Sequence, residues 1–379
     1  MELPDGCGDK SGEIVKLNKA VYGHKQAGRQ WSLRLTQVLV EKVEVEQCKA
    51  DPCVFRLRID GETVMILCVH VDDIIVGGES EVCDALYASL LKEFQTTQGN
   101  LSWYLGCAFE RDKAGGVLRM SQRAFKESVA SRYGIDTVSG LPASQSADLG
   151  PRREGEPVCD KPVRAAVGSL IWVGGMTRPD IANAVRAVAR QPHYPAERHW
   201  RAVCKIISHL NGTKKLGLVF SKRGGLKLSV YVDADYAGMR SVSGVAVVLG
   251  GTSVIASSTT QHCVTLSTSE AGYVAMAQGA KTALFTRAVL AFLQPQLVGR
   301  IIDLFEDNQG ATAMAENPIS GGHTKHIDVR YHFIRELVKH KVIAIKYTES
   351  RDQHADILTK AIGAEGFVRH RRFLMNLPG

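Results

Sequence analysis

Four acidic side chains in the C-terminal part of the chain have the types and local settings that metal-assisted chemistry requires. They are Asp233 in VYVDADYAG, Glu270 in STSEAGY, Asp307 in LFEDNQGA and Asp356 in QHADILTK. Each acid stands where the local pattern predicts a strand end, a helix start or a loop. Acids in such places can converge on divalent metal ions, which is the minimum equipment for cutting a phosphodiester bond.

The ligand types indicate which metal is expected. Phosphodiester hydrolysis of this kind uses two divalent ions roughly 4 Å apart, one activating water and one stabilising the leaving oxygen. Carboxylate oxygens without thiols suit Mg²⁺ or Mn²⁺. We therefore predict that the metal ligands and catalytic residues are Asp233, Glu270, Asp307 and Asp356. His354 is a weaker candidate for proton transfer, and we interpret three further acids as neighbours rather than ligands: Asp235, Glu306 and Asp352.

The elements expected to position these acids form an ordered series. Strand patterns begin at Leu226 with LKLSVYVDA, SGVAVVL and SVIASSTT, and a long helix over 270–293 follows. A strand over 301–305, a helix from Gly310, a strand over 342–347 and a short helix over 355–360 complete the series. Three strands, helix, strand, helix, strand, helix is the element order of a ribonuclease H core.

Local patterns also predict how two of the acids are oriented. On the first strand, residues spaced by two share a face, so Asp233 is expected opposite Val230 and Val232. Glu270 opens the long helix, with Ser269 or Thr268 as the expected cap. After Asp307, a basic helix contains His326 and Arg330, which we predict to contact the phosphate backbone of a substrate.

The first 225 residues read differently from this series. Residues 1–140 show mixed α and β patterns, with a helix from Gly28 and two apolar segments flanking Asp72 and Asp73. A linker-like stretch rich in Ser, Pro and Gly covers 139–162, and helical patterns cover 163–213. We predict three regions from these patterns: a mixed α and β region over 1–140, a linker-like and helical region over 141–225, and a third domain over 226–379.

Composition bounds the class of protein. The chain has 379 residues, of which 45% are hydrophobic and 23% charged, as expected for a soluble protein of two or three domains. Its formal net charge of +8 suits a polyanionic partner. The nine cysteines are scattered and lack the spacing of zinc sites, and the N-terminal residues contain no apolar signal core. Together these features indicate reduced thiols in the cytoplasm or nucleus. No apolar run is long enough for a membrane span.

Many segments together resemble a known family. VDADYAG, SVSGVAVVLGG, LSTSEAGYVA, EDNQGA, KHIDVRYHFIRE and ADILTK resemble the ribonuclease H domain of copia-type LTR retrotransposon Pol polyproteins. KLNKAVYGHKQAGRQW, VHVDDIIVGG, WYLGCAFER and TRPDIANAV resemble that family's reverse transcriptase and connecting region. The resemblance runs from about Val15 to Lys360. It implies an α+β reverse transcriptase palm and connection fragment, with a truncated palm and thumb-like region over 1–140 and a linker and connection region over 141–225. An α/β ribonuclease H-like domain with a mixed five-stranded sheet would follow over 226–379.

The resemblance also implies a second acidic site. Asp72 and Asp73 would lie at a β-hairpin turn and hold catalytic Mg²⁺, and Gln26 would lie near the incoming nucleotide. The sequence departs from the family at four positions. His70 replaces Tyr, His24 and Gly28 replace Leu and Pro, and Gly272 replaces Glu. None of these changes removes a predicted ligand.

A polymerase of this family needs a third carboxylate upstream of Val15, and no such segment is present. We therefore expect this chain alone not to polymerise DNA. Association with an intact polymerase copy is a separate expectation. The expected activity is hydrolysis of RNA in RNA–DNA hybrids. Two alternatives remain: a degenerate module that binds nucleic acid without cutting it, and a non-functional transposon remnant.

Overall fold

The computed structural model describes residues 2–191, 193–236, 240–316 and 325–378, and it leaves the side chains of 325–331 undescribed. The chain divides into two compact units. The first comprises Met1–Leu101 with Ala288–Gln296, and the second comprises Ser102–Arg287 with Leu297–Gly379. The three-domain boundaries expected from the sequence stay a prediction, and each unit is described by itself.

The first unit is built on an antiparallel sheet with two helices. Its strands, in the order β1-β2-β3-β4, are Glu46–Gln47, Val54–Ile59, Glu62–His70 and Asp73–Gly78. Helices α1 (Ala27–Lys42) and α2 (Ser80–Leu91) supply apolar side chains to its core, among them Leu35, Leu39, Leu86 and Leu90. These pack with Phe55, Met65 and Leu67 of the strands, so the core lies on one face of the sheet.

The hairpin between β3 and β4 carries the second acidic pair. His70 pairs with Asp73 in the antiparallel register, which leaves Val71 and Asp72 as the turn. The acidic pair therefore lies at a hairpin turn, as the resemblance implied. Both acids are exposed to solvent.

In the second unit, one sheet and a group of helices precede the predicted acid-bearing region. Strands β5 (Trp103–Tyr104), β6 (Cys107–Asp112), β7 (Val117–Ser121) and β8 (Leu218–Ser221) form an antiparallel sheet. Helices α3 (Arg123–Arg132), α4 (Val163–Met176), α5 (Ala182–Ala189) and α6 (Glu197–Gly212) pack around an apolar core of their own. The hairpin and all four helices match the sequence patterns. Strand β8 was not predicted.

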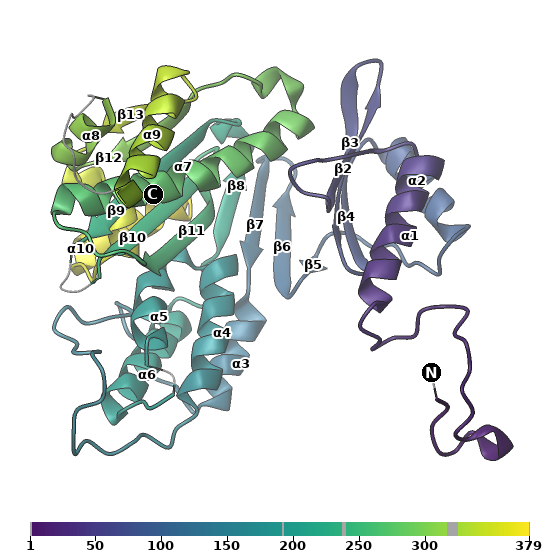
Figure 1. Ribbon diagram of the computed structural model, residues 1–379, viewed down its shortest axis with the longest axis horizontal. Helices are drawn as coiled ribbons and strands as arrows, with labels where there is room; N and C mark the ends of the chain where they lie inside the picture. The colour runs from purple at the N-terminus through teal and green to yellow at the C-terminus, as the bar shows by residue number, and fades with distance from the viewer. Residues whose placement is uncertain (1, 192, 237–239, 317–324, 379) are drawn as a thin grey trace. The chain divides into compact units, whose positions relative to one another are not determined.

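A mixed five-stranded sheet lies at the centre of the second unit (Figure 1). Its order is β11-β10-β9-β12-β13, where β9 is Leu228–Asp235, β10 is Val242–Leu249 and β11 is Thr252–Thr260. These three strands are antiparallel, whereas β12 (Ile302–Glu306) runs parallel to β9 and β13 (Ile343–Tyr347) runs parallel to β12. This arrangement confirms the predicted ribonuclease H-like domain with a mixed five-stranded sheet.

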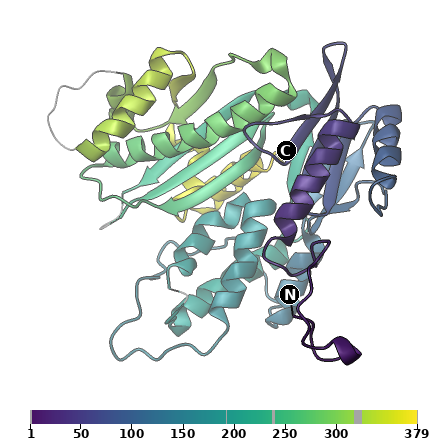
Figure 2. The same cartoon turned by 45° about the vertical axis from the view of Figure 1, so that its right-hand side comes forward.

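Different elements cover the two faces of this sheet. Helix α7 (Thr268–Leu293) crosses one face (Figure 2), where Met276 and Ala280 pack on Val230 and Val232. The helix approaches the sheet so closely here that a Cβ at Gly279 would lie only 2.4 Å from a methyl carbon of Val232. The other face packs on the short helix η6 (His354–Leu358) and on α10 (Ala364–Leu374). Strand β9 thus divides its faces as the alternation predicted.

The remaining elements differ little from expectation. Helix α8 spans Gln309–Glu316 and α9 spans Lys325–Lys339. The helix expected over 355–360 is a 3-10 helix that ends at Leu358, and α10 was not predicted. Further 3-10 turns are η1 (Gly8–Lys10), η2 (Pro179–Ile181), η3 (Lys222–Gly224), η4 (Pro295–Leu297) and η5 (Ser350–Asp352). Over the described ranges, no helix has the length and apolarity to cross a lipid bilayer.

Candidate functional site

A cleft of about 250 Å³ opens at the carboxyl ends of β9 and β12. Because these strands are parallel neighbours, their carboxyl ends meet at one edge of the sheet. The cleft is lined by Asp233, Ala234, Thr268, Gly272, Glu306, Asp307, Asn308 and Lys360. Two of the four predicted acids, Asp233 and Asp307, therefore line one cavity together.

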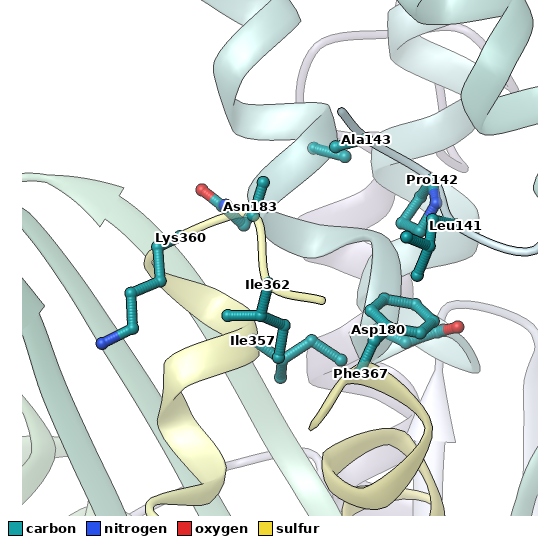
Figure 3. A pocket seen from close by; sticks show the side chains of 11 residues that line it. Leu141, Pro142, Ala143, Asp180, Asn183, Ile357, Lys360, Ile362 and Phe367 are labelled. Atoms are coloured by element: carbon teal, nitrogen blue, oxygen red, sulfur yellow. The ribbon is translucent and has the colours of Figure 1, made fainter. Parts of the chain in front are cut away.

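Asp356 is connected to this cleft through a lysine on the same chain segment. Lys360 Nζ lies 3.0 Å from Asp356 Oδ1 and 3.8 Å from Asp233 Oδ2. The hydroxyl group of Thr359 donates a hydrogen bond to Asp233. In Figure 3 the Lys360 side chain extends away from the apolar side chains of Ile357 and Phe367. Asp233, Asp356 and Lys360 thus form one charged cluster.

The segment that carries Asp356 and Lys360 packs directly against β10. A Cβ at Gly244 would lie 2.8 Å from Thr359 Cγ2 and 2.9 Å from the carbonyl oxygen of Ala355. Only a residue without a side chain leaves room for this approach. Gly244 thereby allows η6 to bring Asp356 to the end of β9.

Burial and like charge shift the protonation of Asp356. Burial, followed by the neighbouring Asp233 carboxylate, raises the pKa of Asp356 to about 7, although Lys360 opposes the shift. Burial alone would lower the pKa of Lys360, but Asp233 and Asp356 raise it. Two carboxylates and one ammonium in a partly desolvated cleft account for both directions.

Glu306, which the sequence pattern indicated to be a neighbour of the predicted ligands, is a buried acid. Only 1% of the residue is exposed. Its Oε1 accepts a hydrogen bond of 3.0 Å from the backbone N–H of Asn308, whereas its buried Oε2 has no hydrogen-bond partner in the described part of the chain. Burial, together with Asp233 and Asp307, raises the pKa of Glu306 well above the usual range. Strand alternation could have identified it, since Glu306 shares a face with Leu304.

Asp307 and Glu270 make different local interactions. Asp307 Oδ2 accepts a hydrogen bond of 2.7 Å from the Ser350 hydroxyl group. Glu270 is buried, but it is not among the residues that line the cleft. Its Oε2 accepts a hydrogen bond of 2.6 Å from the backbone N–H of Leu266. The cap of α7 is Ser267, whose Oγ accepts a hydrogen bond from the Glu270 N–H, so the predicted caps Ser269 and Thr268 were wrong.

His354, the weaker candidate for proton transfer, lies in an aromatic cluster. Its ring stacks on Phe373 with a centroid distance of 3.5 Å, and its Nδ1 lies 3.1 Å from Nδ1 of His370. Burial, followed by the charge of His370, lowers the pKa of His354 to about 4. His354 is absent from the lining of the cleft.

The donor set of the cleft fits a hard divalent cation in its chemistry. Its lining includes the carboxylates of Asp233, Glu306 and Asp307, and one of their oxygens, Glu306 Oε2, is buried without a partner in the described ranges. Carboxylates of this kind suit Mg²⁺ or Mn²⁺. Within the described residues, however, no three His, Cys, Asp or Glu side chains are already arranged to hold a metal ion. Here the ammonium group of Lys360 approaches two of the carboxylates.

The first unit brings together two further predicted residues. Gln26 and Asp72 line a pocket of about 1060 Å³, which also includes Trp31 and Arg34. Trp31 Nε1 donates a hydrogen bond of 2.7 Å to the carbonyl oxygen of Val71 and so ties α1 to the hairpin turn. Asp73 starts β4 and is absent from the lining. The predicted substrate contacts His326 and Arg330 have side chains outside the described residues.

Comparison with known proteins supplies the family. The family model for reverse transcriptase (RNA-dependent DNA polymerase) matches residues 1–142. The Pol polyprotein of transposon TNT 1-94 from Nicotiana tabacum is 31% identical over 97% of this chain and 28% of its own length. That of transposon RE2 from Arabidopsis thaliana is 32% identical over 98% of this chain and 26% of its own length.

A solved structure shows a weaker likeness. The foamy viral protease-reverse transcriptase in complex with an RNA/DNA hybrid has a TM-score of 0.47 and 12% identity, covering 87% of this chain and 39% of that chain. The chain spans about a quarter of the length of the transposon polyproteins it matches. Over nearly all its length, however, it aligns with them, and its mixed sheet has the ribonuclease H-like order. The chain therefore belongs to the copia-type retrotransposon Pol polyproteins, as a region with a reverse transcriptase part and a ribonuclease H-like domain.

Proposed function

We propose that the second unit hydrolyses the RNA strand of RNA–DNA hybrids with the help of divalent metal ions. The observation that carries this proposal is the shared cleft of Asp233 and Asp307 at the ends of two parallel strands. Asp356 joins the same cluster through Lys360. Membership of the retrotransposon family and the formal net charge of +8 favour a nucleic acid as the substrate.

The proposed metal ligands are Asp233, Glu270, Asp307 and Asp356. Bound Mg²⁺ or Mn²⁺ would supply the activation of water and the stabilisation of the leaving oxygen. Asp233 and Asp356 can exchange the Lys360 ammonium for a metal ion, because both lie within 4 Å of it. Glu270 would give up its hydrogen bond from Leu266, and Asp307 its hydrogen bond from Ser350.

Cleavage of a labelled RNA–DNA hybrid tests this function. The full chain should cut the RNA strand with Mg²⁺ and should not cut it when EDTA is present. Asp307→Asn should abolish cutting while hybrid binding is largely kept, because the amide retains the shape of the carboxylate but loses its charge. Equal cutting by this variant would remove Asp307 from the site.

Two controls separate the site from the rest of the chain. Asp303→Asn removes a carboxylate from the same strand, where Asp303 pairs with Lys227 and Lys346, and it should leave cutting intact. Asp72→Asn alters the hairpin of the first unit and should also leave it intact. Binding of the hybrid without metal-dependent cutting would instead favour the nucleic-acid-binding module.

For the first unit, we propose that Asp72 and Asp73 form a second site for Mg²⁺, with Gln26 near a bound nucleotide. The pocket that Gln26 and Asp72 line together supports this proposal. Both acids are exposed, so water or a metal ion can reach them. Binding of Mn²⁺ to wild-type protein and to Asp72→Asn, compared by titration, would show one site fewer in the variant.

A further inference from the structure

Among the residues that the structure describes, Glu306 Oε2 has no hydrogen-bond partner, although it is buried. A buried carboxylate oxygen without a partner costs free energy, because water no longer solvates it. Glu306 also lines the cleft that contains Asp233 and Asp307. Its other oxygen is satisfied by the backbone N–H of Asn308. One oxygen is therefore held in place, and the other has no partner among the described residues.

Gly272 of α7 lies beside the Glu306 carboxylate in the lining of the cleft. A Cβ at position 272 would lie 3.6 Å from Glu306 Oε1 and 3.1 Å from the Cβ of Ala311. Any larger side chain at 272 would compete with the Glu306 carboxylate for the same wall of the cleft. Gly272 is also one of the departures from the family pattern. In this part of the cleft lining, β12 provides the carboxylate of Glu306, whereas α7 has a glycine at position 272.

We propose that Glu306 is a further metal ligand of this chain, binding a divalent cation in the cleft through Oε2. The proposal rests on the proposed function, since it concerns the same metal site, and it adds a ligand from β12 beside Asp307. The metal ion would provide the partner that Oε2 lacks among the described residues. The hydrogen bond from Asn308 would fix the carboxylate in position for this contact.

Direct titration of the full chain with Mn²⁺ tests this inference, with free Mn²⁺ measured by electron paramagnetic resonance and no substrate present. All proteins are compared in an Asp72→Asn background, which removes the site proposed for the first unit. Glu306→Gln retains the size of the side chain and an acceptor for the Asn308 N–H, but it removes the charge. We expect its Mn²⁺ affinity to fall about tenfold or more. Glu306→Asp keeps the charge and withdraws the carboxylate by one methylene group, so it should also weaken binding.

Two comparisons make the result decisive. Asp303→Asn, a carboxylate loss on the same strand outside the cleft, should leave Mn²⁺ affinity unchanged. Asp233→Asn should greatly weaken binding if the proposed metal centre exists. Weak binding by Asp233→Asn with wild-type affinity in folded Glu306 variants would overturn the role of Glu306 alone. Absence of Mn²⁺ binding by the wild-type chain would overturn both proposals. Circular dichroism identifies the folded variants, and Glu306→Asp decides if Glu306→Gln does not fold.

Discussion

Lys360 Nζ lies 3.0 Å from Asp356 Oδ1, four residues earlier in the chain. The same ammonium group lies 3.8 Å from Asp233 Oδ2, so a single positive charge offsets the repulsion between two carboxylates. Because 42% of the Lys360 side chain is exposed, it can leave the cluster without disrupting the core. In the proposed metal site, Lys360 is therefore a cation attached to the protein that a metal ion would have to displace.

Replacing Lys360 should separate two effects of its charge: stabilisation of the two carboxylates and competition with a metal ion. Lys360→Met keeps much of the apolar stem but removes the charge, so the metal-free protein should unfold at a lower temperature. Added Mg²⁺ should raise the unfolding temperature more in the variant than in the wild type, because no ammonium group competes with the ion. Thermal unfolding with and without Mg²⁺ measures both changes.

The matched control for this experiment is Lys346→Met. Lys346 pairs with Asp303 at 2.8 Å, outside the cleft. The effect of Mg²⁺ on its unfolding temperature should equal that of the wild type. A smaller effect of Mg²⁺ in Lys360→Met than in the wild type would mean that Lys360 assists metal binding.

The pKa of Asp356 predicts how the stability of the metal-free protein depends on pH. The folded-state pKa of about 7 lies above the ordinary value of 3.8, so the folded protein holds a proton that the unfolded chain releases. The contribution of this group to stability is therefore largest at low pH and is lost as the pH rises towards 7. Asp356→Asn should flatten this dependence.

Denaturant unfolding at about pH 5 and about pH 8 measures this effect. The wild-type chain should lose more stability between these conditions than Asp356→Asn loses. Because other groups titrate as well, the difference between the two proteins is the relevant quantity. An identical loss in both proteins would show that ionisation of Asp356 does not destabilise the folded state.

A buried ion cluster between the helices of the second unit makes a third prediction. Asp180 accepts two hydrogen bonds from Arg178, at 2.8 and 2.7 Å, and His209 Nε2 lies 3.2 Å from it. Burial alone would raise the pKa of Asp180, but the Arg178 charge and the hydrogen bonds of Arg178 and His209 hold it well below its usual range. Asp180→Asn should cost about 3–5 kcal/mol of unfolding free energy, because Arg178 stays buried and loses its counter-charge.

Equilibrium denaturation provides the measurement for Asp180→Asn. Glu127→Gln is a suitable comparison, because Glu127 pairs with Arg123 and Lys214 on the surface. It should show no measurable change, since exposed ion pairs contribute little. Similar losses in both variants would argue against a special cost of the buried charge.

Gly244→Ala should disturb the site more than the sheet. The added methyl group would lie 2.8 Å from Thr359 Cγ2 and 2.9 Å from the Ala355 carbonyl oxygen, so η6 must shift. Overpacking of this kind costs about 1–3 kcal/mol. We expect a folded protein with weaker Mn²⁺ binding, measured by titration. Gly363→Ala, where a Cβ would meet nothing within 4 Å, is the control and should retain wild-type affinity.

Much of the five-stranded fold follows from the sequence, because its strands alternate or are continuously apolar. The buried side chains of Val230, Val232, Val245 and Val247 give an unmistakable β pattern, and they pack under a long apolar helix. The opposite face was harder to anticipate. Helix α10 is rich in Arg and His, and its buried residues are only Phe367, His370 and Leu374.

The candidate site was predicted less completely than the fold. Asp233 and Asp307 line the cleft because strand order places them there, which a sequence pattern can indicate. Glu306 was not predicted as a ligand because adjacent acids look equivalent in a sequence, whereas burial in the structure distinguishes it from Asp307. The cap of α7 was misplaced by one or two residues, since three consecutive hydroxyl residues, Ser267 to Ser269, could each cap a helix.

The hydrogen bond from Trp31 to the Val71 carbonyl has a spectroscopic consequence. Trp31 also packs edge-on against Phe94, with ring centroids 5.1 Å apart. The other three tryptophans, Trp103, Trp172 and Trp200, belong to the second unit. In a chain that retains only Trp31, fluorescence would report the hairpin turn alone. Ligands arriving at Asp72 would change the polarity around the indole ring, so the emission wavelength would record their binding without any attached label.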